Sequence, residues 1–395
     1  MNNRKIPSLR FEGFSDDWEQ RKAKNIFEHL SEKGRPDLPV LSVTQDRGVV
    51  YRKEVGIDIK YDDSTLMNYK VINPGDFIIS LRSFQGGFEL SNKLGITSPA
   101  YTVFIPKESG LHDNQYWRTK FKTFQFIESL KTVTFGIRDG KSISFSEFGD
   151  LKIFVPYLNE QAQIGKFFKK FDDAIALQER ELDLLKEQKK GFLQKMFPKY
   201  NEKVPELRFE GFDDDWEQRK LGSMGKFNPK SELPEKFEYV DLESVVGTEL
   251  VSHRTENKKS APSRAQRLAE KGDLFYQTVR PYQKNNYLYN LPYDNYVFST
   301  GYAQIRPESN GFFLLTLLQE EKFVNRVLVR STGTSYPAIN SKDLEKILIT
   351  VPTEKEEQTK IGYFFKQLDK TITLQEQQLE KLKEMKKGFL QKMFV

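Results

Sequence analysis

Two stretches of the chain, 164–197 and 361–394, place apolar side chains at alternating steps of four and three residues. In each stretch eight of ten such positions are apolar, and the polar exceptions coincide, Gln178 with Gln375 and Lys189 with Lys386. This 3.5-residue period is typical of a coiled-coil seam, where polar residues fix register at some cost in stability. The expected seam comprises Ile164, Phe168, Phe171, Ile175, Leu182, Leu185 and Phe192, then Ile361, Phe365, Leu368, Ile372, Leu379, Leu382 and Phe389.

Such helices require an apolar partner surface, and each is the nearest candidate partner of the other. The alternative is that each packs separately, as an amphipathic helix, on its own domain. Pairing is favoured because the seam extends over five heptads and the other faces carry balanced charge. About 35 residues at about 1.5 Å each span roughly 50 Å. An antiparallel pair would hold two flanking domains apart, related by an approximate two-fold axis.

The helices belong to a larger internal repeat. Residues 7–22 recur as 205–220 with 14 of 16 positions identical, and 164–197 recur as 361–394 with 23 of 34 identical. The segments between these repeats have similar lengths but little sequence in common. A period near 200 residues is too long for a solenoid and indicates a duplicated module. We divide the chain into 1–155, a first domain; 156–198, a first helix; 199–351, a second domain; and 352–395, a second helix.

The two dissimilar segments repeat one order of predicted elements. Pro-Gly or Gly-Asp turns precede apolar, β-branched runs, which predict a turn followed by a strand. A second turn and strand, a helical stretch, and a Gly-rich turn before a last strand follow in both halves. These elements are expected at 71–82, 98–106, 113–130 and 135–142 in the first half, and at 271–280, 299–307, 311–329 and 331–337 in the second.

Composition narrows the function classes. A chain of 395 residues suits two or three domains, and its net charge of +6 modestly favours an anionic partner. It has no cysteine, and its three histidines, His29, His112 and His253, are distant in sequence, so we expect no metal site. No apolar stretch approaches the length of a membrane span, and the first residues lack the apolar core of a secretory signal. We therefore expect a cytoplasmic protein that makes no membrane contact.

Motifs that could support catalysis are weak. Gly136–Ser142 is one residue shorter than a phosphate-binding G-x-x-x-x-G-K-[ST] loop, so we interpret it as a surface turn. Asp37, Asp58 and Lys60 fit the loose P-D…[DE]-x-K pattern of metal-dependent nucleases, in which carboxylates hold Mg²⁺. The second half has no convincing equivalent. A single-chain endonuclease therefore stays open as an alternative, as does a coiled-coil scaffold that binds only proteins.

The repeated motifs resemble those of the specificity subunits of type I restriction–modification enzymes over essentially the whole chain. The resemblance rests on Leu9-Arg10-Phe11 to Trp18 with its second copy, and on the shared Gly-Phe-Leu-Gln-Lys-Met-Phe helix ends. It also rests on the proline-containing helix entries, Val155-Pro156 to Gln163-Ile164 and Val351-Pro352 to Lys360-Ile361.

This resemblance implies an α+β fold: two repeated α/β target-recognition domains separated by two long helices that form an antiparallel coiled coil. Each domain would read one half of a bipartite double-stranded DNA target, and the helices would set the gap and dock the methyltransferase subunits. Two methyltransferase and two restriction–translocase subunits would complete the enzyme. The chain itself would be non-catalytic and hold no cofactor, with S-adenosylmethionine, ATP and Mg²⁺ on the partner subunits.

Candidate DNA contacts lie on loops after predicted strands and in one basic stretch. Lys and Arg are expected at phosphates, whereas Arg, Gln, Asn, Ser and Thr read base edges. In the first domain the candidates are Arg82, Ser83, Gln85, Arg138 and Lys141. In the second they are Arg254, Lys258, Lys259, Arg280, Tyr282, Gln283, Lys284, Ser335 and Tyr336.

Overall fold

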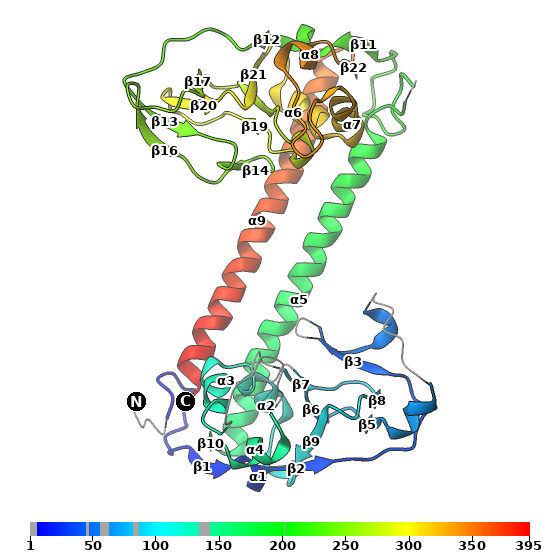
Figure 1. Ribbon diagram of the computed structural model, residues 1–395, viewed down its shortest axis with the longest axis vertical. Coiled ribbons are helices and arrows are strands. Elements are labelled where there is room, and N and C mark those ends of the chain that lie inside the picture. The colour runs from blue at the N-terminus through cyan, green and yellow to red at the C-terminus, as the bar shows by residue number, and fades with distance from the viewer. Residues whose placement is uncertain (1–5, 45–46, 56–62, 82–86, 134–142, 201) are drawn as a thin grey trace. The chain divides into compact units, whose positions relative to one another are not determined.

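The computed structural model describes residues 6–44, 47–55, 63–81, 87–133, 143–200 and 202–395. Two compact units divide the chain. The first combines Met1–Glu179 with Gln377–Val395, and the second is Arg180–Glu376. Each unit contains one of the two dissimilar segments together with parts of both long helices (Figure 1). Among the described helices, none combines the length and the apolar character that crossing a membrane demands.

The long helices are α5, Leu158–Lys195, and α9, Lys355–Met393. In the first unit Phe171 of α5 contacts Phe389 of α9 with ring centres 5.7 Å apart. In the second unit Phe192 contacts Phe364 at 5.0 Å. Asp172 also pairs with Lys386, and Lys189 pairs with Asp369, so in each unit residue numbers rise along one helix as they fall along the other. The pairing within each unit is therefore antiparallel, as predicted.

The seam residues divide into two groups. Ile164 and Phe168 lie in the core of the first unit, and Ile361 and Phe365 lie in that of the second. The first two seam positions of each helix therefore pack into the core of a domain. To that extent the alternative, in which each helix packs on its own domain, is correct. Buried side chains farther along are Leu182 and Leu379; half-buried ones are Phe171, Ile175, Leu185, Phe192, Leu368, Ile372, Leu382 and Phe389.

The first unit is built on a four-stranded sheet in the order β2-β9-β6-β7. Aromatic rings fill its core; Phe27, for example, lies 4.8 Å from Trp117 and 5.3 Å from Phe104. Two-stranded pairs β1-β10, β3-β4 and β5-β8 complete the strands that the structure describes. Their bounds are β1 Glu19–Lys22, β2 Phe27–Leu30, β3 Leu41–Thr44, β4 Gly48–Tyr51, β5 Lys70–Ile72, β6 Phe77–Ile79, β7 Phe88–Leu90, β8 Gly95–Thr97, β9 Thr102–Pro106 and β10 Lys152–Val155.

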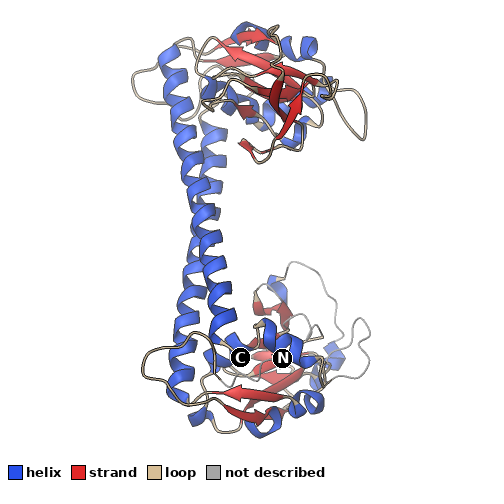
Figure 2. Cartoon of the chain, turned by 90° about the vertical axis from the view of Figure 1, so that its left-hand side faces the viewer, coloured by secondary structure: helices blue, strands red, loops and turns tan. Residues whose placement is uncertain are grey.

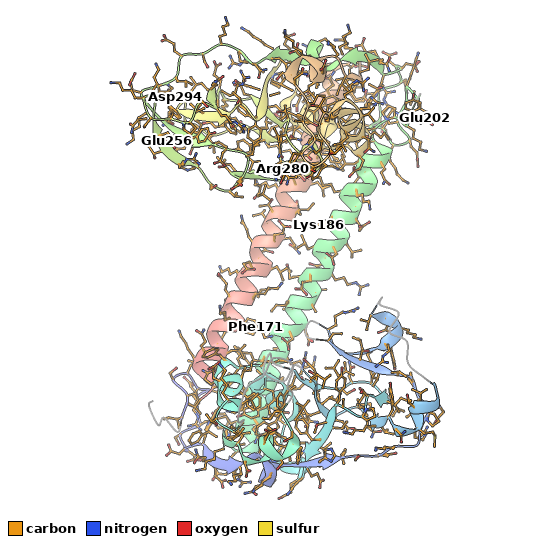
Figure 3. The ribbon with its side chains drawn as sticks, in the orientation of Figure 1. Phe171, Lys186, Glu202, Glu256, Arg280 and Asp294 are labelled. Carbon is orange, nitrogen blue, oxygen red and sulfur yellow. The ribbon has the colours of Figure 1, made fainter. Side chains whose placement is uncertain are left out.

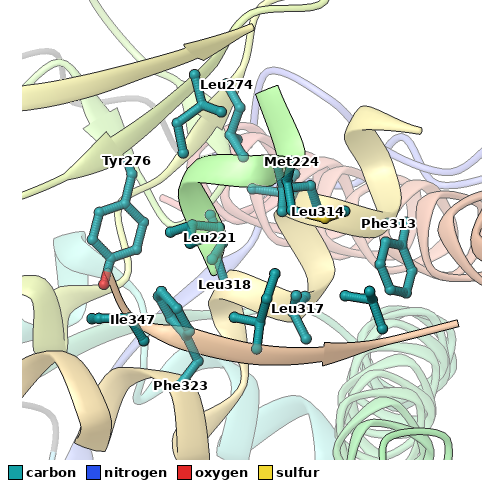
Figure 4. Close-up of a cluster of buried hydrophobic side chains, with 14 of the residues drawn as sticks. Leu221, Met224, Leu274, Tyr276, Phe313, Leu314, Leu317, Leu318, Phe323 and Ile347 are labelled. Atoms are coloured by element: carbon teal, nitrogen blue, oxygen red, sulfur yellow. The ribbon is translucent and has the colours of Figure 1, made fainter. Parts of the chain in front are cut away.

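The second unit has the counterpart sheet β12-β21-β18-β19 and a further sheet β16-β13-β20-β17. Figure 2 shows the strands of each unit gathered beside the long helices. The larger core joins Leu274 and Tyr276 of β18 to Phe313 and Leu317 of a covering helix (Figure 4). The strands are β11 Glu217–Lys220, β12 Gly225–Phe227, β13 Lys236–Val240, β14 Val245–Val246, β15 Glu249–Leu250, β16 Arg254–Asn257, β17 Ala265–Leu268, β18 Leu274–Gln277, β19 Tyr287–Leu288, β20 Tyr296–Ser299, β21 Tyr302–Pro307 and β22 Leu348–Val351.

In each module the repeated N-terminal motif ends in a strand that pairs with the last strand of that module. Its last four residues form β1, which pairs antiparallel with β10 through Glu19 opposite Val155. In the second unit β11 pairs with β22 in the same register, with Glu217 opposite Val351. The first and last strands of a module are thus neighbours, which explains why identical frames enclose dissimilar contents.

Within the described residues the predicted turn-and-strand elements are present, and the turn predicted at 135–142 lies outside those residues. The helical stretches were predicted too simply. The stretch 113–130 forms two helices, α2 Asn114–Lys120 and α3 Phe124–Leu130, because Thr123 takes an extended conformation and caps α3. The stretch 311–329 forms α6 Gly311–Gln319 and α7 Glu321–Arg330, divided at the extended residue Glu320. Short helices that were not predicted also occur. α1, Ala23–Ile26, follows β1, and α4, Phe145–Asp150, and α8, Ser341–Glu345, precede the last strand of each half.

Candidate nucleic-acid interface

A short loop after β18 carries four of the predicted contact residues. It consists of one 3-10 turn, Pro281–Gln283, between Arg280 and Lys284. Both flanking residues have left-handed backbones, with φ of 54° and 57°. A non-glycine residue in this region costs roughly 1–2 kcal/mol, so surrounding contacts must hold it there. The Arg280 amide donates to the Pro337 carbonyl at 2.7 Å, and the Gln319 side chain donates to the Lys284 carbonyl at 2.9 Å.

The tertiary structure brings the Gly-rich turn against this loop. Ala338 forms bridges with both Val279 and Thr332, and Gly333 adopts a φ of 89° at the tip of the turn. As a result, the Arg280 guanidinium lies 5.5 Å from the centre of the Tyr336 ring. The two candidates are 56 positions apart in sequence yet form one surface, on which the Tyr336 side chain is 68% exposed.

Two buried polar residues, Gln277 and Asn286, form a polar layer that packs beneath the loop and bonds to it. Gln277 and Asn286 are each only 1% exposed. The Gln277 amide donates to Asn286 Oδ1 at 2.8 Å, and its side-chain Nε2 donates to Gln283 Oε1 at 2.9 Å. Within the described residues, Gln277 Oε1, Asn286 Nδ2 and Arg280 Nε are buried without a hydrogen-bond partner. Unsatisfied buried groups of this kind are energetically expensive, and a functional site is one of the explanations for them.

The remaining loop candidates differ in how free their side chains are. Lys284 is ion-paired with Glu321 of α7. Tyr282 and Gln283 are exposed, as is Ser335 on the neighbouring turn. Together with the neighbouring turn, the loop presents a guanidinium that no described carboxylate pairs with, a neutralised ammonium and two tyrosine rings. Figure 3 labels Arg280.

The basic stretch in the second domain lies on a different sheet. Arg254 on β16 pairs with Asp241 at 2.6 Å and with Glu256 at 2.9 Å, and it stacks over the Tyr239 ring. Lys258 lies 4.0 Å from Glu235, and Lys259 is exposed just beyond the strand. Carboxylates thus offset much of the positive charge that the sequence places here.

The first-domain candidates Arg82, Ser83, Gln85, Arg138 and Lys141 lie outside the described residues. The same is true of Asp58 and Lys60 of the nuclease alternative. Its third member, Asp37, is exposed and bonded to Arg35, whose guanidinium lowers the pKa of that carboxyl group. The described residues contain no group of three or more histidine, aspartate or glutamate side chains placed to hold a metal ion.

Sequence reasoning missed the polar layer formed by Gln277 and Asn286. Gln277 ends an apolar strand, where alternation alone predicts little about its burial, and Asn286 reads as an ordinary loop residue. A glutamine at the end of a strand, followed nine residues later by an asparagine, is too common a pattern to have identified them.

The duplicated module, with one compact unit for each copy, defines a two-domain protein. The chain belongs to the family of the type I restriction modification DNA specificity domain, whose model matches residues 15–187 and 213–384. The two matches coincide with the two copies of the repeat, so each copy is one specificity domain.

Curated relatives carry the same assignment. The chain is 24% identical over 194 residues to the type I restriction enzyme HindI specificity subunit of Haemophilus influenzae, covering 46% of this chain and 41% of that protein. It is 26% identical to a putative MjaX specificity subunit of Methanocaldococcus jannaschii, covering 63% and 60%. The MjaVIII specificity subunit of that organism is 24% identical, covering 81% and 78%. The alignments with the first two span less than two thirds of those proteins.

Two solved structures have this fold. The type I restriction–modification S subunit from M. genitalium superposes with a TM-score of 0.64 at 15% identity, covering 99% of both chains. A chain from a study of complex assembly and conformational transition of the type I restriction–modification system gives 0.52 at 16% identity, covering 95% and 97%. At these identities the likeness shows the fold, two α+β domains with a pair of long helices.

Proposed function

We propose that this chain is the DNA-reading subunit of a type I restriction–modification complex, in which each module reads one half of a bipartite target. The observation that supports this most is the duplication itself: closely similar frames hold two domains whose loops differ, as two readers of different half-sites require. Membership of the specificity family supports the same role.

The loop surface of the second module suits a DNA groove. Arg280 and Gln283 are side chains that can read base edges, Lys284 suits a phosphate, and Tyr282 and Tyr336 can pack on sugar or base, with Ser335 beside them on the neighbouring turn. Arg254, Lys258 and Lys259, at the sheet that contains β16, would contact phosphates from there. By their expected positions, Arg82, Ser83, Gln85, Arg138 and Lys141 would act in the same way in the first module.

The helix pair would set the gap between the half-sites and dock the methyltransferase subunits. In support, α5 and α9 are continuous over 38 and 39 residues, and each contributes to both compact units. The complete complex would contain two methyltransferase and two restriction–translocase subunits. Methyl transfer, ATP hydrolysis and cleavage would belong to those subunits, so the chain itself would be non-catalytic and act in the cytoplasm.

The decisive experiment is co-expression of the chain with its methyltransferase subunit in a host that lacks DNA methylation, followed by sequencing of methylated positions. The expected result is one bipartite motif, with adenines modified in both halves and a constant gap. Methylation that is absent, or that follows no bipartite motif, would contradict the proposal. Plasmid cleavage by the purified chain with Mg²⁺, abolished in Asp58→Ala, would instead establish the nuclease.

A further inference from the structure

We infer that Arg280 reads a guanine in the half-site of the second module, with the Tyr336 ring as the platform that orients its guanidinium. This inference rests on the proposed function and assigns one base contact within it. The juxtaposition that carries it is the Arg280 guanidinium 5.5 Å from the Tyr336 ring centre, on an exposed surface.

Arg280 differs from the neighbouring cations because, among the described residues, its charge has no counter-ion. Lys284 pairs with Glu321, and Arg254 pairs with two carboxylates. In the part of the chain that the structure describes, no carboxylate forms an ion pair with Arg280, and its Nε is buried without a partner. Because no described carboxylate neutralises the guanidinium, its terminal nitrogens can donate to acceptors that a ligand supplies.

The geometry of the pair favours a base over a phosphate. A guanidinium that lies on an aromatic face keeps its edge free, and that edge donates two parallel hydrogen bonds. Guanine presents O6 and N7 side by side in the major groove, and arginine is the commonest side chain that contacts both. A phosphate would accept from lysine equally well and would require no aromatic platform.

The backbone around Arg280 is preorganised for such a contact. Its left-handed conformation, its amide bond to Pro337 and the buried chain from Asn286 through Gln277 to Gln283 all restrict the loop. A side chain held in its bound conformation loses less entropy on binding. Backbone strain that surrounding contacts maintain at a half-buried surface residue is typical of a functional position.

The test measures binding of the chain, assembled with its methyltransferase subunits, to duplexes in which each base pair of the target is changed in turn. In Arg280→Lys and Arg280→Ala, discrimination at one G·C pair of one half-site should fall by roughly 5- to 150-fold, the range of a bidentate contact. Tyr336→Ala should reduce discrimination at the same pair, and Tyr336→Phe should preserve it because the ring face remains.

Lys284→Ala is the matched control in the same loop. It should weaken binding evenly across all duplexes and keep the preference at the G·C pair. Uniform weakening in Arg280→Lys, without relaxed discrimination, would assign Arg280 to a phosphate and overturn the inference. An unchanged base preference in both Arg280 variants would overturn it as well. A wild-type complex that recognises no bipartite target would instead refute the proposed function, so the two failures are distinguishable.

Discussion

Arg10 and Glu160 form a two-point ion pair that fastens the opening repeat to the first turn of α5. Arg10 Nε and Nη2 donate to the two carboxylate oxygens at 2.6 and 2.7 Å, and the Glu160 side chain is 2% exposed. In the second unit Arg208 and Glu357 repeat the arrangement at 2.7 and 2.8 Å. The carboxylate also lies at the helix N-terminus, where the helix dipole favours negative charge. The repeated Leu-Arg-Phe motif thus joins each module to a long helix.

Removing the arginine should therefore destabilise its own unit strongly. In Arg10→Ala the buried Glu160 carboxylate loses its counter-charge, which costs about 3–5 kcal/mol for buried pairs. Denaturant unfolding followed by tryptophan fluorescence would report the loss. The control is Arg21→Ala, since Arg21 and Glu19 form an exposed pair whose loss should cost less than about 1 kcal/mol. Equal effects of the two variants would refute a structural role for the buried pair.

Alanine substitution should destabilise the protein at one pair of repeated glycines and stabilise it at another pair. A Cβ at Gly165 would lie 2.3 Å from Asp113 Oδ1 and 2.7 Å from the Tyr116 nitrogen, and Gly362 meets Asn310 and Phe313 in the same way. Gly165→Ala should displace the cap of α2 and cost at least about 1 kcal/mol.

Gly191 and Gly388 supply the matched control. A Cβ at either position meets nothing within 4 Å. Alanine there should stabilise the helix by about 0.5–1 kcal/mol, because glycine in a helix interior loses more backbone freedom on folding. Thermal unfolding of the four variants would check both signs, and a destabilising Gly191→Ala would contradict the prediction.

The stability of the first unit should rise with pH above neutrality. Lys120 lies against the Trp18 and Phe394 rings, and burial lowers its pKa to about 7. Between about pH 7 and pH 10 the unfolded chain keeps a proton that the folded chain has released, so raising the pH favours folding.

In Lys120→Leu this pH dependence should shrink, and the gain in Tm over wild type should be larger at pH 7 than at pH 10. Leucine suits the site because Leu317 occupies the corresponding position of the second unit and is 4% exposed. Lys131→Gln, at an exposed position, should keep the wild-type pH profile. A Tm difference in Lys120→Leu that is constant with pH would contradict the assignment.

Charge reversal should test the pairing of the helices. Lys189 pairs with Asp369 in the second unit, and Lys386 pairs with Asp172 in the first, as equivalent contacts of the two repeats. Asp369→Lys places two cations together and should destabilise the second unit by roughly 0.5–1 kcal/mol, given the partial exposure of both side chains. Adding Lys189→Asp should restore stability if the two residues interact directly; additive losses would show that they do not.

Shortening both helices should change the gap in the recognised sequence. Deleting 177–183 from α5 and 374–380 from α9 removes one heptad from each and preserves the seam. Seven residues at about 1.5 Å each correspond to roughly three base pairs. Methylome sequencing should show a shorter gap with unchanged half-sites; an unchanged gap would contradict the spacing role. The same deletion in one helix only should abolish sequence-specific methylation, because the apolar positions of the two helices no longer face each other.

The sequence by itself determined the duplicated frame, the two long helices and, in each half, the turn-and-strand elements around β6 and β9 or around β18 and β21. These depend on local signals: a 3.5-residue period over five heptads, and turns at Gly75 and Gly272, both of which adopt positive φ. The division of the helical stretches at Thr123 and Glu320 was missed, since a single cap or extended residue carries little weight against a continuous helical pattern.

Only the tertiary structure decided which distant residues meet. The Arg10–Glu160 pair spans 150 positions, and Arg280 reaches Tyr336 because Ala338 bridges to both Val279 and Thr332. The period of apolar residues and the secondary-structure propensity describe a residue and its neighbours along the chain. They carry no information about which residues distant in sequence come into contact. The tertiary structure also showed that Lys120 and Gln277 are buried. The sequence identifies them as polar residues but does not show which other segments pack against them.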